Sequence, residues 1–139
     1  GKSGVITETE AYIGEDDPAC HASAGRTKRT QTMYEQAGTA YVYLIYGMHH
    51  CLNFVTESVD FPAAVLIRGV KADGVPDEKL NGPAKVCRYF GITRAQNGAD
   101  IVQSESFYVE QTGFSPAFKT TARIGISKGT DKLWRFVAV

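Results

Sequence analysis

Short apolar segments, rich in β-branched and aromatic residues and separated by Gly, Pro, Asp and Ser, predict a chain built mainly from β-strands. These strands follow one another without the regular helices that a parallel sheet needs, so the sheet is expected to be mainly antiparallel. The predicted strands are Val5–Tyr12, Thr39–Tyr46, Met48–Thr56, Ala63–Val70, Ser106–Glu110, Thr121–Ile126 and Leu133–Val139.

Helix signals occur in two places. The stronger one is Asn81–Phe90, where Asn81 suits the N-cap, Pro83 suits the first turn and an apolar face precedes Gly91. A shorter turn of helix is expected over Thr30–Gln36. The pattern therefore predicts an α+β fold with a curved, mainly antiparallel sheet and a few helices.

Two connections stand out from the others. Gly47 separates two strand-like segments and indicates a tight hairpin turn or a bulge, which makes a projecting β-hairpin. The polar segment Gly14–Thr32 is a long loop between the first two strands, and long loops in compact domains are usually functional. No repeat or linker divides the chain, so residues 1–139 are expected to form a single domain.

Composition excludes several classes of protein. Fifteen Lys and Arg balance fifteen Asp and Glu, so the chain as a whole has no net charge to attract a polyanion. Cys20, Cys51 and Cys87 form no C-x-x-C pair, which argues against a disulfide framework or a zinc ribbon and favours a reducing compartment. No segment has the apolar length of a membrane span or the pattern of a signal peptide.

Charged residues in the strands are the first candidates for chemistry. In a strand, Glu8 and Glu10 face one side together with Ile6 and Tyr12. A carboxylate beside apolar groups suits a general base, but two acids on the solvent face of an edge strand give the same pattern. Arg68 lies among apolar residues, so it is expected to pair with a carboxylate or a phosphate.

The long loop offers two further possibilities. Asp16, Asp17 and His21 are metal-ligand types, but their spacing matches no standard ligand set. A solvated surface loop is the plain alternative. The basic residues that follow fit phosphate contacts better; they are Arg26, Lys28 and Arg29.

Tyrosines and histidines surround the predicted hairpin. Tyr41 and Tyr43 share one strand face, where packing is the ordinary role and stacking on bases is the alternative. His49, His50 and Cys51 are adjacent in a strand, so they point to opposite faces and cannot all reach one metal ion.

Six segments, taken in order, carry a resemblance to a known family: TETEAY, DDPACHASAGRTKRT, YVYLIYGMHHCLN, AAVLIRGV, NGPAKVC and RIGI. Together they resemble the 3-methyladenine DNA glycosylase family of the alkyladenine (mammalian MPG) type. The resemblance runs from about Gly4 to Phe136, which is almost the whole chain. It implies an enzyme that flips a damaged purine nucleotide out of duplex DNA and hydrolyses its N-glycosidic bond.

The resemblance also implies roles for single residues. Glu10 would be the general base that deprotonates the attacking water, which Arg68 and the main-chain carbonyl of Ile124 would help to hold.

The base pocket follows in the same way. Tyr12 and Tyr43 would sandwich the flipped base, His21 would offer a hydrogen bond, Asn53 would crowd the exocyclic amine of guanine, and Tyr46 would be the wedge that fills the gap in the duplex.

The resemblance implies no metal and no cofactor. No Lys matches a pocket position, so water is the expected nucleophile and no strand cleavage is expected. The implied partner is double-stranded DNA containing damaged purines, bound by a monomer that is cytoplasmic in a bacterium or nuclear in a eukaryote. Expected phosphate contacts are Arg26, Lys28, Arg29, Lys85, Arg123, Lys128 and Lys132.

The chain departs from the family pattern in a few places. It begins at GKSG, so an N-terminal segment is expected to be missing, and Lys28 stands where the family usually has Pro. Two other functions stay open. One is a catalytically silent binder of damaged DNA; the other is a metal-assisted hydrolase that would use Asp16, Asp17, Glu10 and His21 and lose its activity to a chelator.

Overall fold

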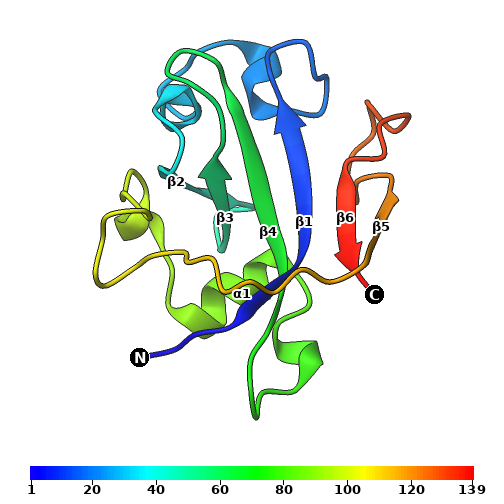
Figure 1. Ribbon diagram of the computed structural model, residues 1–139. Coiled ribbons are helices and arrows are strands. Elements are labelled where there is room, and N and C mark those ends of the chain that lie inside the picture. Colours follow the sequence, from blue (N-terminus) through cyan, green and yellow to red (C-terminus); the bar gives the residue numbers. More distant parts are fainter.

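Six strands form one open antiparallel sheet in the computed structural model, which describes all residues 1–139 (Figure 1). The strand order is β2-β3-β4-β1-β6-β5, and every neighbouring pair is antiparallel. The α+β prediction is confirmed. The strands are β1 (Val5–Ile13), β2 (Ala40–Ile45), β3 (His49–Val55), β4 (Ala63–Lys71), β5 (Phe118–Thr121) and β6 (Arg135–Ala138).

One α-helix and four 3-10 helices complete the fold. Helix α1 (Pro83–Phe90) begins with its proline and ends at Gly91, which adopts the left-handed conformation with φ 69°. Asn81 does not cap α1 as predicted, because Gly82 occupies the N-cap and the Asn81 side chain accepts a hydrogen bond from Lys85. The 3-10 helices are η1 (His21–Ala24), η2 (Gln31–Tyr34), η3 (Asp77–Lys79) and η4 (Arg94–Gln96).

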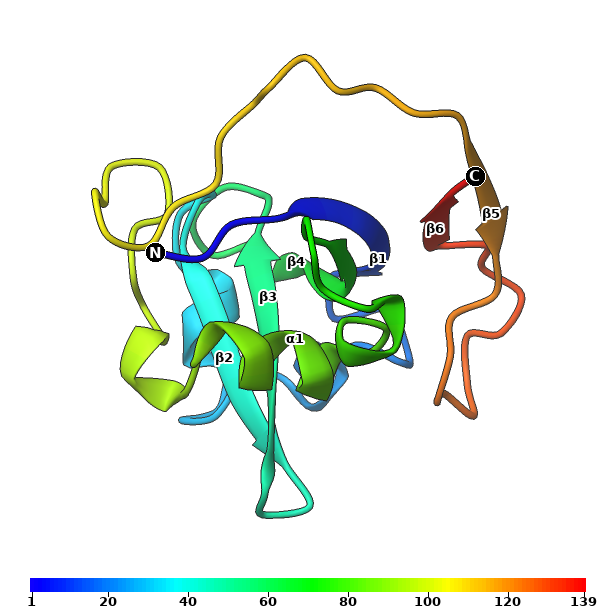
Figure 2. The same ribbon diagram turned by 90° about the horizontal axis from the view of Figure 1, so that it is seen from below.

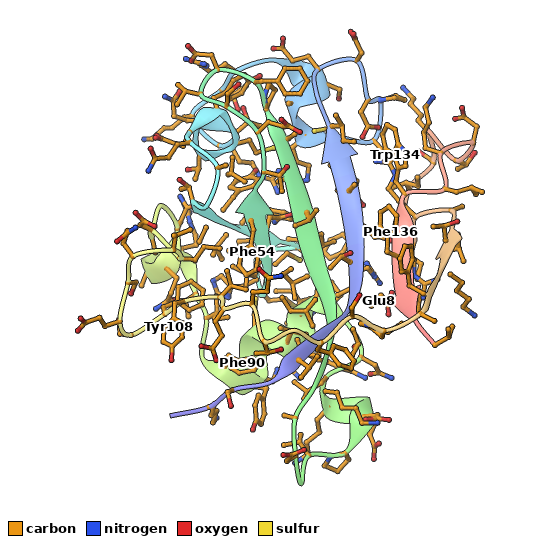
Figure 3. The ribbon with its side chains drawn as sticks, viewed as in Figure 1. Glu8, Phe54, Phe90, Tyr108, Trp134 and Phe136 are labelled. Carbon is orange, nitrogen blue, oxygen red and sulfur yellow. The ribbon has the colours of Figure 1, made fainter.

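Helix α1 covers one face of the sheet (Figure 2). Its Val86 and Cys87 are buried against side chains from β2, β3 and β4, and Phe54 and Phe90 pack at the margin of this core (Figure 3). None of the helices is long and apolar enough to cross a bilayer. The buried members of this first core are Ala40, Val42, Leu52, Ile67, Val70, Ala72, Leu80, Val86, Cys87, Ile92 and Ile101.

The long loop after β1 covers the opposite face. It contains helix η1, which the sequence did not predict. Helix η2 follows and matches the short turn of helix expected over 30–36. These segments pack onto β2, β3 and β4 in a second core made of Cys20, Ala22, Met33, Tyr34, Tyr41, Val55 and Ala64. The loop is therefore fixed to the sheet by buried side chains, which gives its polar residues defined positions.

Two predicted strands were wrong. Residues 106–110 have no regular structure, because no strand lies beside them to pair with (Figure 2). The strand predicted over 121–126 is observed instead as β5 at Phe118–Thr121. The chain leaves the sheet after β5 because the next residues turn inward, where Arg123 is buried and the Ile124 amide bonds to Glu10.

Candidate active site

An irregularity between β1 and β4 sets the direction of the site's charged side chains. Glu8 lies opposite Gly69, and the next pair along is Thr9 with Ile67, so Arg68 has no partner on β1. Such a β-bulge re-aims the side chain of the extra residue, and bulges are common next to active sites. Here the extra residue is Arg68, which lines a cavity.

A second shift in the pairing, between Ile6 and Glu8, leaves Thr7 without a partner on β4 and corrects one prediction. Ile6 pairs with Val70 and packs against the first core, on the α1 side of the sheet. Glu10 pairs with Leu66, which lines the cavity on the other side. Ile6 therefore does not share a face with Glu10, because the extra residue Thr7 between them reverses the alternation of side chains along β1.

Glu10 is fully buried in the middle of the sheet. Its Oε1 accepts a hydrogen bond from the Tyr12 hydroxyl at 2.8 Å, and its Oε2 accepts one from the Ile124 amide at 2.6 Å. The Arg68 guanidinium lies 3.6 Å from Oε1. A solvent-facing acid on an edge strand is excluded, because β1 lies between β4 and β6 and the Glu10 side chain is 0% exposed.

Glu8 lies two residues before Glu10 on β1 and pairs with two arginines. Its Oε2 accepts hydrogen bonds from Arg135 at 2.7 Å and from Arg68 at 3.3 Å. The expectation that Arg68 pairs with a carboxylate is confirmed. Sequence reasoning missed Arg135, because nothing local indicates that β6 pairs with β1.

Tyr12 connects Glu10 to a second buried charge. Burial raises the pKa of Tyr12, and the charge and hydrogen bond of Glu10 raise it further, so its hydroxyl keeps its proton. The Arg123 guanidinium lies 4.7 Å from the centre of the Tyr12 ring and 5.0 Å from that of Trp134. Contacts of this kind between a cation and an aromatic face are attractive.

Arg123 is not the phosphate contact that was expected. Its side chain is 0% exposed and makes a two-point ion pair with Asp17, at 2.6 and 2.9 Å. It also donates to the Ala11 carbonyl at 2.9 Å. Burial alone would raise the pKa of Asp17, but the hydrogen bonds from Arg123, Ile13 and Ala19 hold it below its usual value. The pair joins the long loop to the segment that carries Ile124.

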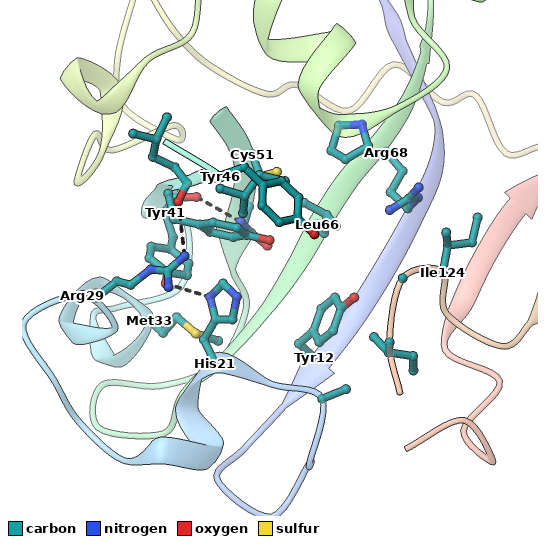
Figure 4. Close-up of a pocket in the computed structure, with 18 residues that line it drawn as sticks. Tyr12, His21, Arg29, Met33, Tyr41, Tyr46, Cys51, Leu66, Arg68 and Ile124 are labelled. Carbon is teal, nitrogen blue, oxygen red and sulfur yellow. Dashed lines mark hydrogen bonds between the residues drawn. The ribbon is translucent and has the colours of Figure 1, made fainter. Parts of the chain in front are cut away.

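A cavity of about 530 Å³ opens on the side of the sheet covered by the long loop (Figure 4). This volume is in the range of small-molecule sites. Tyr12 and His21 from η1 lie low in the view, Tyr41 and Tyr46 lie above them to the left, and Arg68 and Ile124 lie to the right (Figure 4). The cavity lining includes all seven residues expected to bind the base, hold the water or fill the gap in the duplex: Tyr12, His21, Tyr43, Tyr46, Asn53, Arg68 and Ile124. Glu10 does not line the cavity but bonds to Tyr12 and to the Ile124 amide, which do.

His21 is held by aromatic neighbours. Its Nδ1 lies 3.1 Å from the Tyr41 hydroxyl, and its ring centre lies 4.3 Å from that of Tyr43. Burial lowers the pKa of His21, and the nearby charge of Arg29 lowers it further. Burial also raises the pKa of Tyr41 to about 12. At neutral pH the cavity therefore presents an uncharged imidazole and protonated phenols.

Asn53 and Tyr46 differ in exposure. Asn53 is buried at the cavity wall and donates to the Tyr41 carbonyl at 3.2 Å. Tyr46 is 90% exposed at the tip of the β2–β3 hairpin. Its φ is 51° and that of Gly47 is 69°, in a turn closed by the Met48 amide on the Ile45 carbonyl. The predicted hairpin turn is confirmed, and an exposed tyrosine holds a conformation that costs a non-glycine residue energy.

The other basic residues expected to contact phosphate lie at the surface. Arg29 lines the cavity, with its guanidinium 5.6 Å from the centre of the Tyr43 ring. Arg26 is exposed and pairs with Asp60, Lys85 donates to Asn81, and Lys28 is exposed. Their contacts with phosphate stay a prediction.

The residues of the metal-assisted alternative do not form a ligand set. Asp17 forms an ion pair with Arg123, while Glu10 accepts hydrogen bonds from Tyr12 and from the Ile124 amide. No group of three or more His, Cys, Asp or Glu side chains has the geometry to hold a metal ion. The arrangement therefore disfavours the metal-assisted hydrolase and favours chemistry that uses the buried carboxylate itself.

Comparison with known proteins gives a consistent family. Residues 1–139 match the model of the methylpurine-DNA glycosylase (MPG) family. A protein of Rickettsia felis named "Putative 3-methyladenine DNA glycosylase" is 58% identical over 137 residues, which cover 99% of this chain and 77% of that protein. A protein of the same name from Rickettsia prowazekii is 45% identical over 178 residues, covering 99% and 82%. The chain belongs to the methylpurine-DNA glycosylase family.

Proposed function

We propose that this protein flips alkylated or deaminated purines out of duplex DNA and hydrolyses their N-glycosidic bond with an activated water. The observation that carries the proposal is the position of Glu10. Its carboxylate is fully buried, and the three residues that hydrogen-bond or pair with it, Tyr12, Arg68 and Ile124, all line a cavity of about 530 Å³.

The chemical step needs only water and this carboxylate. The water oxygen attacks C1′ of the sugar while Glu10 takes the water's proton, and the electron pair of the glycosidic bond leaves with the base. Tyr12 and the Ile124 amide each use one acceptor position of Glu10, so positions remain for that proton. The negative charge also stabilises the positive charge that develops on the sugar. We propose that Arg68 and the Ile124 carbonyl help to hold the water.

The aromatic walls suit a damaged purine. Tyr12 and Tyr43 both line the cavity, and we propose that the flipped base lies between the two rings. Alkylated purines such as 3-methyladenine carry positive charge, which aromatic faces attract. Uncharged His21 offers one hydrogen bond, and Asn53 would crowd the exocyclic amine of guanine.

Extraction of the base has an energy cost that the hairpin helps to offset. Unstacking and unpairing cost a few kcal/mol, least for a damaged base, while stacking on an aromatic ring returns about 1 to 3 kcal/mol per base. Tyr46, exposed at the hairpin tip, would fill the space that the extruded base leaves. Exposed cations such as Lys28 and Arg29 would contact the phosphates of the double-stranded partner.

Base release and product analysis test this proposal. The protein is incubated with duplexes that contain hypoxanthine or 3-methyladenine, and free base is scored by chromatography. Free base with an intact abasic strand is expected. Because the cavity lining contains no Lys, borohydride should trap no covalent adduct. Tight binding of the lesion without release of base would identify a silent binder instead, and a trapped adduct would contradict the water nucleophile.

A further inference from the structure

We propose that Glu8 is a positioning residue for this reaction: it holds the Arg68 guanidinium away from Glu10 and so leaves the Glu10 carboxylate free to take a proton from water. The inference rests on the proposed function and adds a residue to which the family resemblance gives no role.

Arg68 donates a hydrogen bond to Glu8 and makes only a longer ion-pair contact with Glu10. Its Nε lies 3.3 Å from Glu8 Oε2, within hydrogen-bond distance. Its nearest approach to Glu10 is 3.6 Å, which is too long for a hydrogen bond. One carboxylate therefore fixes the guanidinium, and the other keeps its lone pairs for other partners.

Glu8 is in turn fixed from the other side. Arg135 on β6 donates to the same Glu8 oxygen at 2.7 Å, the shorter of its two ion pairs. A second hydrogen bond, of 3.0 Å, ties Arg135 to the Thr121 hydroxyl at the end of β5. The position of Arg68 on β4 thus depends, through Glu8 on β1, on the far edge of the sheet.

The backbone of β1 and β4 leaves room for the contact between Glu8 and Arg68. The pairing of β1 with β4 shifts on both sides of Glu8, which leaves Thr7 unpaired on β1 and Arg68 unpaired on β4. A Cβ on Gly69 would come within 2.9 Å of the Glu8 Cβ. Glycine at this point of β4 leaves the room that Glu8 occupies.

Loss of the Glu8 charge would redirect Arg68. Glu10 is the only other carboxylate within ion-pair distance of the guanidinium. Arg68 would then close onto Glu10 Oε1, which already accepts a hydrogen bond from Tyr12. A carboxylate with one more donor is a poorer proton acceptor, so the chemical step would slow. Binding of the lesion should not change, because Glu8 does not line the cavity.

The experiment compares Glu8→Gln, Glu8→Asp and Glu10→Gln with the wild type. Glu105→Gln, an exposed glutamate without an ion pair, is the control for the charge change. Each variant is measured for single-turnover base release, affinity for a lesion duplex and melting temperature. General base catalysis contributes about 10²- to 10⁴-fold, so Glu8→Gln should lose about 10- to 100-fold in rate. The affinity of Glu8→Gln should stay at the wild-type value, and Glu8→Asp should recover part of the lost rate. The melting temperature of Glu8→Gln should fall, because Arg68 and Arg135 lose the carboxylate that they share, so the rates are compared at a temperature at which every variant is folded.

Two results would overturn the inference while the proposed function stands. One is a wild-type rate in Glu8→Gln when Glu10→Gln is inactive. The other is a rate loss in Glu8→Gln that is matched by a loss of affinity for the lesion duplex and is no smaller in Glu8→Asp, which would mean a purely structural role. A wild-type rate in Glu10→Gln would instead overturn the proposed function itself.

Discussion

The buried pair of Asp17 and Arg123 shows how single residues hold the site. It joins the segment after β1 to the segment that carries Ile124, and both side chains are almost completely buried. Removal of one partner from a buried ion pair leaves the other charge without compensation. Asp17→Asn should therefore lower the free energy of unfolding by about 3 to 5 kcal/mol at pH 7 in urea titrations. The neighbouring exposed Asp16→Asn should stay within about 0.5 kcal/mol of the wild type.

The same pair predicts the direction of a pH effect. The pKa of Asp17 is lower in the folded protein than its ordinary value of 3.8, so its contribution to stability is complete above that value. The contribution is lost as the pH falls towards the folded value, because both states then bind the proton. The difference in stability between wild type and Asp17→Asn should shrink below about pH 4. A difference that stays constant between pH 7 and pH 3 would contradict this account.

His21 is the second residue whose charge state matters. Burial and the charge of Arg29 both lower its pKa. Arg29→Gln should therefore move the His21 pKa upward, towards the ordinary value of 6.5, in a titration followed by histidine NMR signals. Lys28→Gln, one residue earlier and exposed, is the matched control and should leave that signal in place. An unchanged titration in Arg29→Gln would mean that burial alone sets the value.

At the scale of elements, the β2–β3 hairpin combines a strained turn with an exposed ring. Asn tolerates the left-handed conformation of Tyr46 better than Tyr does, and this conformation costs about 1 to 2 kcal/mol for most residues. Tyr46→Asn should therefore raise the melting temperature but slow base release, because the wedge is lost. Tyr46→Phe keeps both the ring and the strain, so it should match the wild type in stability and release. Wild-type release by Tyr46→Asn would remove Tyr46 from the mechanism.

The elements also show which parts of the fold can be predicted from the sequence. Strands β1 to β4 and helix α1 were predictable because their patterns are local. The strand expected at 106–110 failed because a strand needs a neighbour, and local propensity does not supply one. In the site, the contacts of Glu8 with Arg135 and of Glu10 with the Ile124 amide join residues more than 110 positions apart. Only the folded sheet brings them together.

For the whole molecule, the zero net charge limits how DNA can be bound. Affinity must come from a few local cations, because the formal charges of the chain cancel. Replacement of a phosphate-contacting Lys lowers the slope of log affinity against log salt by about one. Lys28→Ala should show this change equally for damaged and undamaged duplexes. Glu105→Ala, a matched change at an exposed acid, should leave the slope unchanged.

The most direct test of the whole account is single-turnover release of hypoxanthine by wild type and Glu10→Gln. Amide replaces carboxylate with little change in shape, so the affinity for the lesion duplex serves as the control for folding and binding. The account predicts a rate loss of about 10²- to 10⁴-fold with the lesion duplex still bound. Release of free base by Glu10→Gln at the wild-type rate would contradict it.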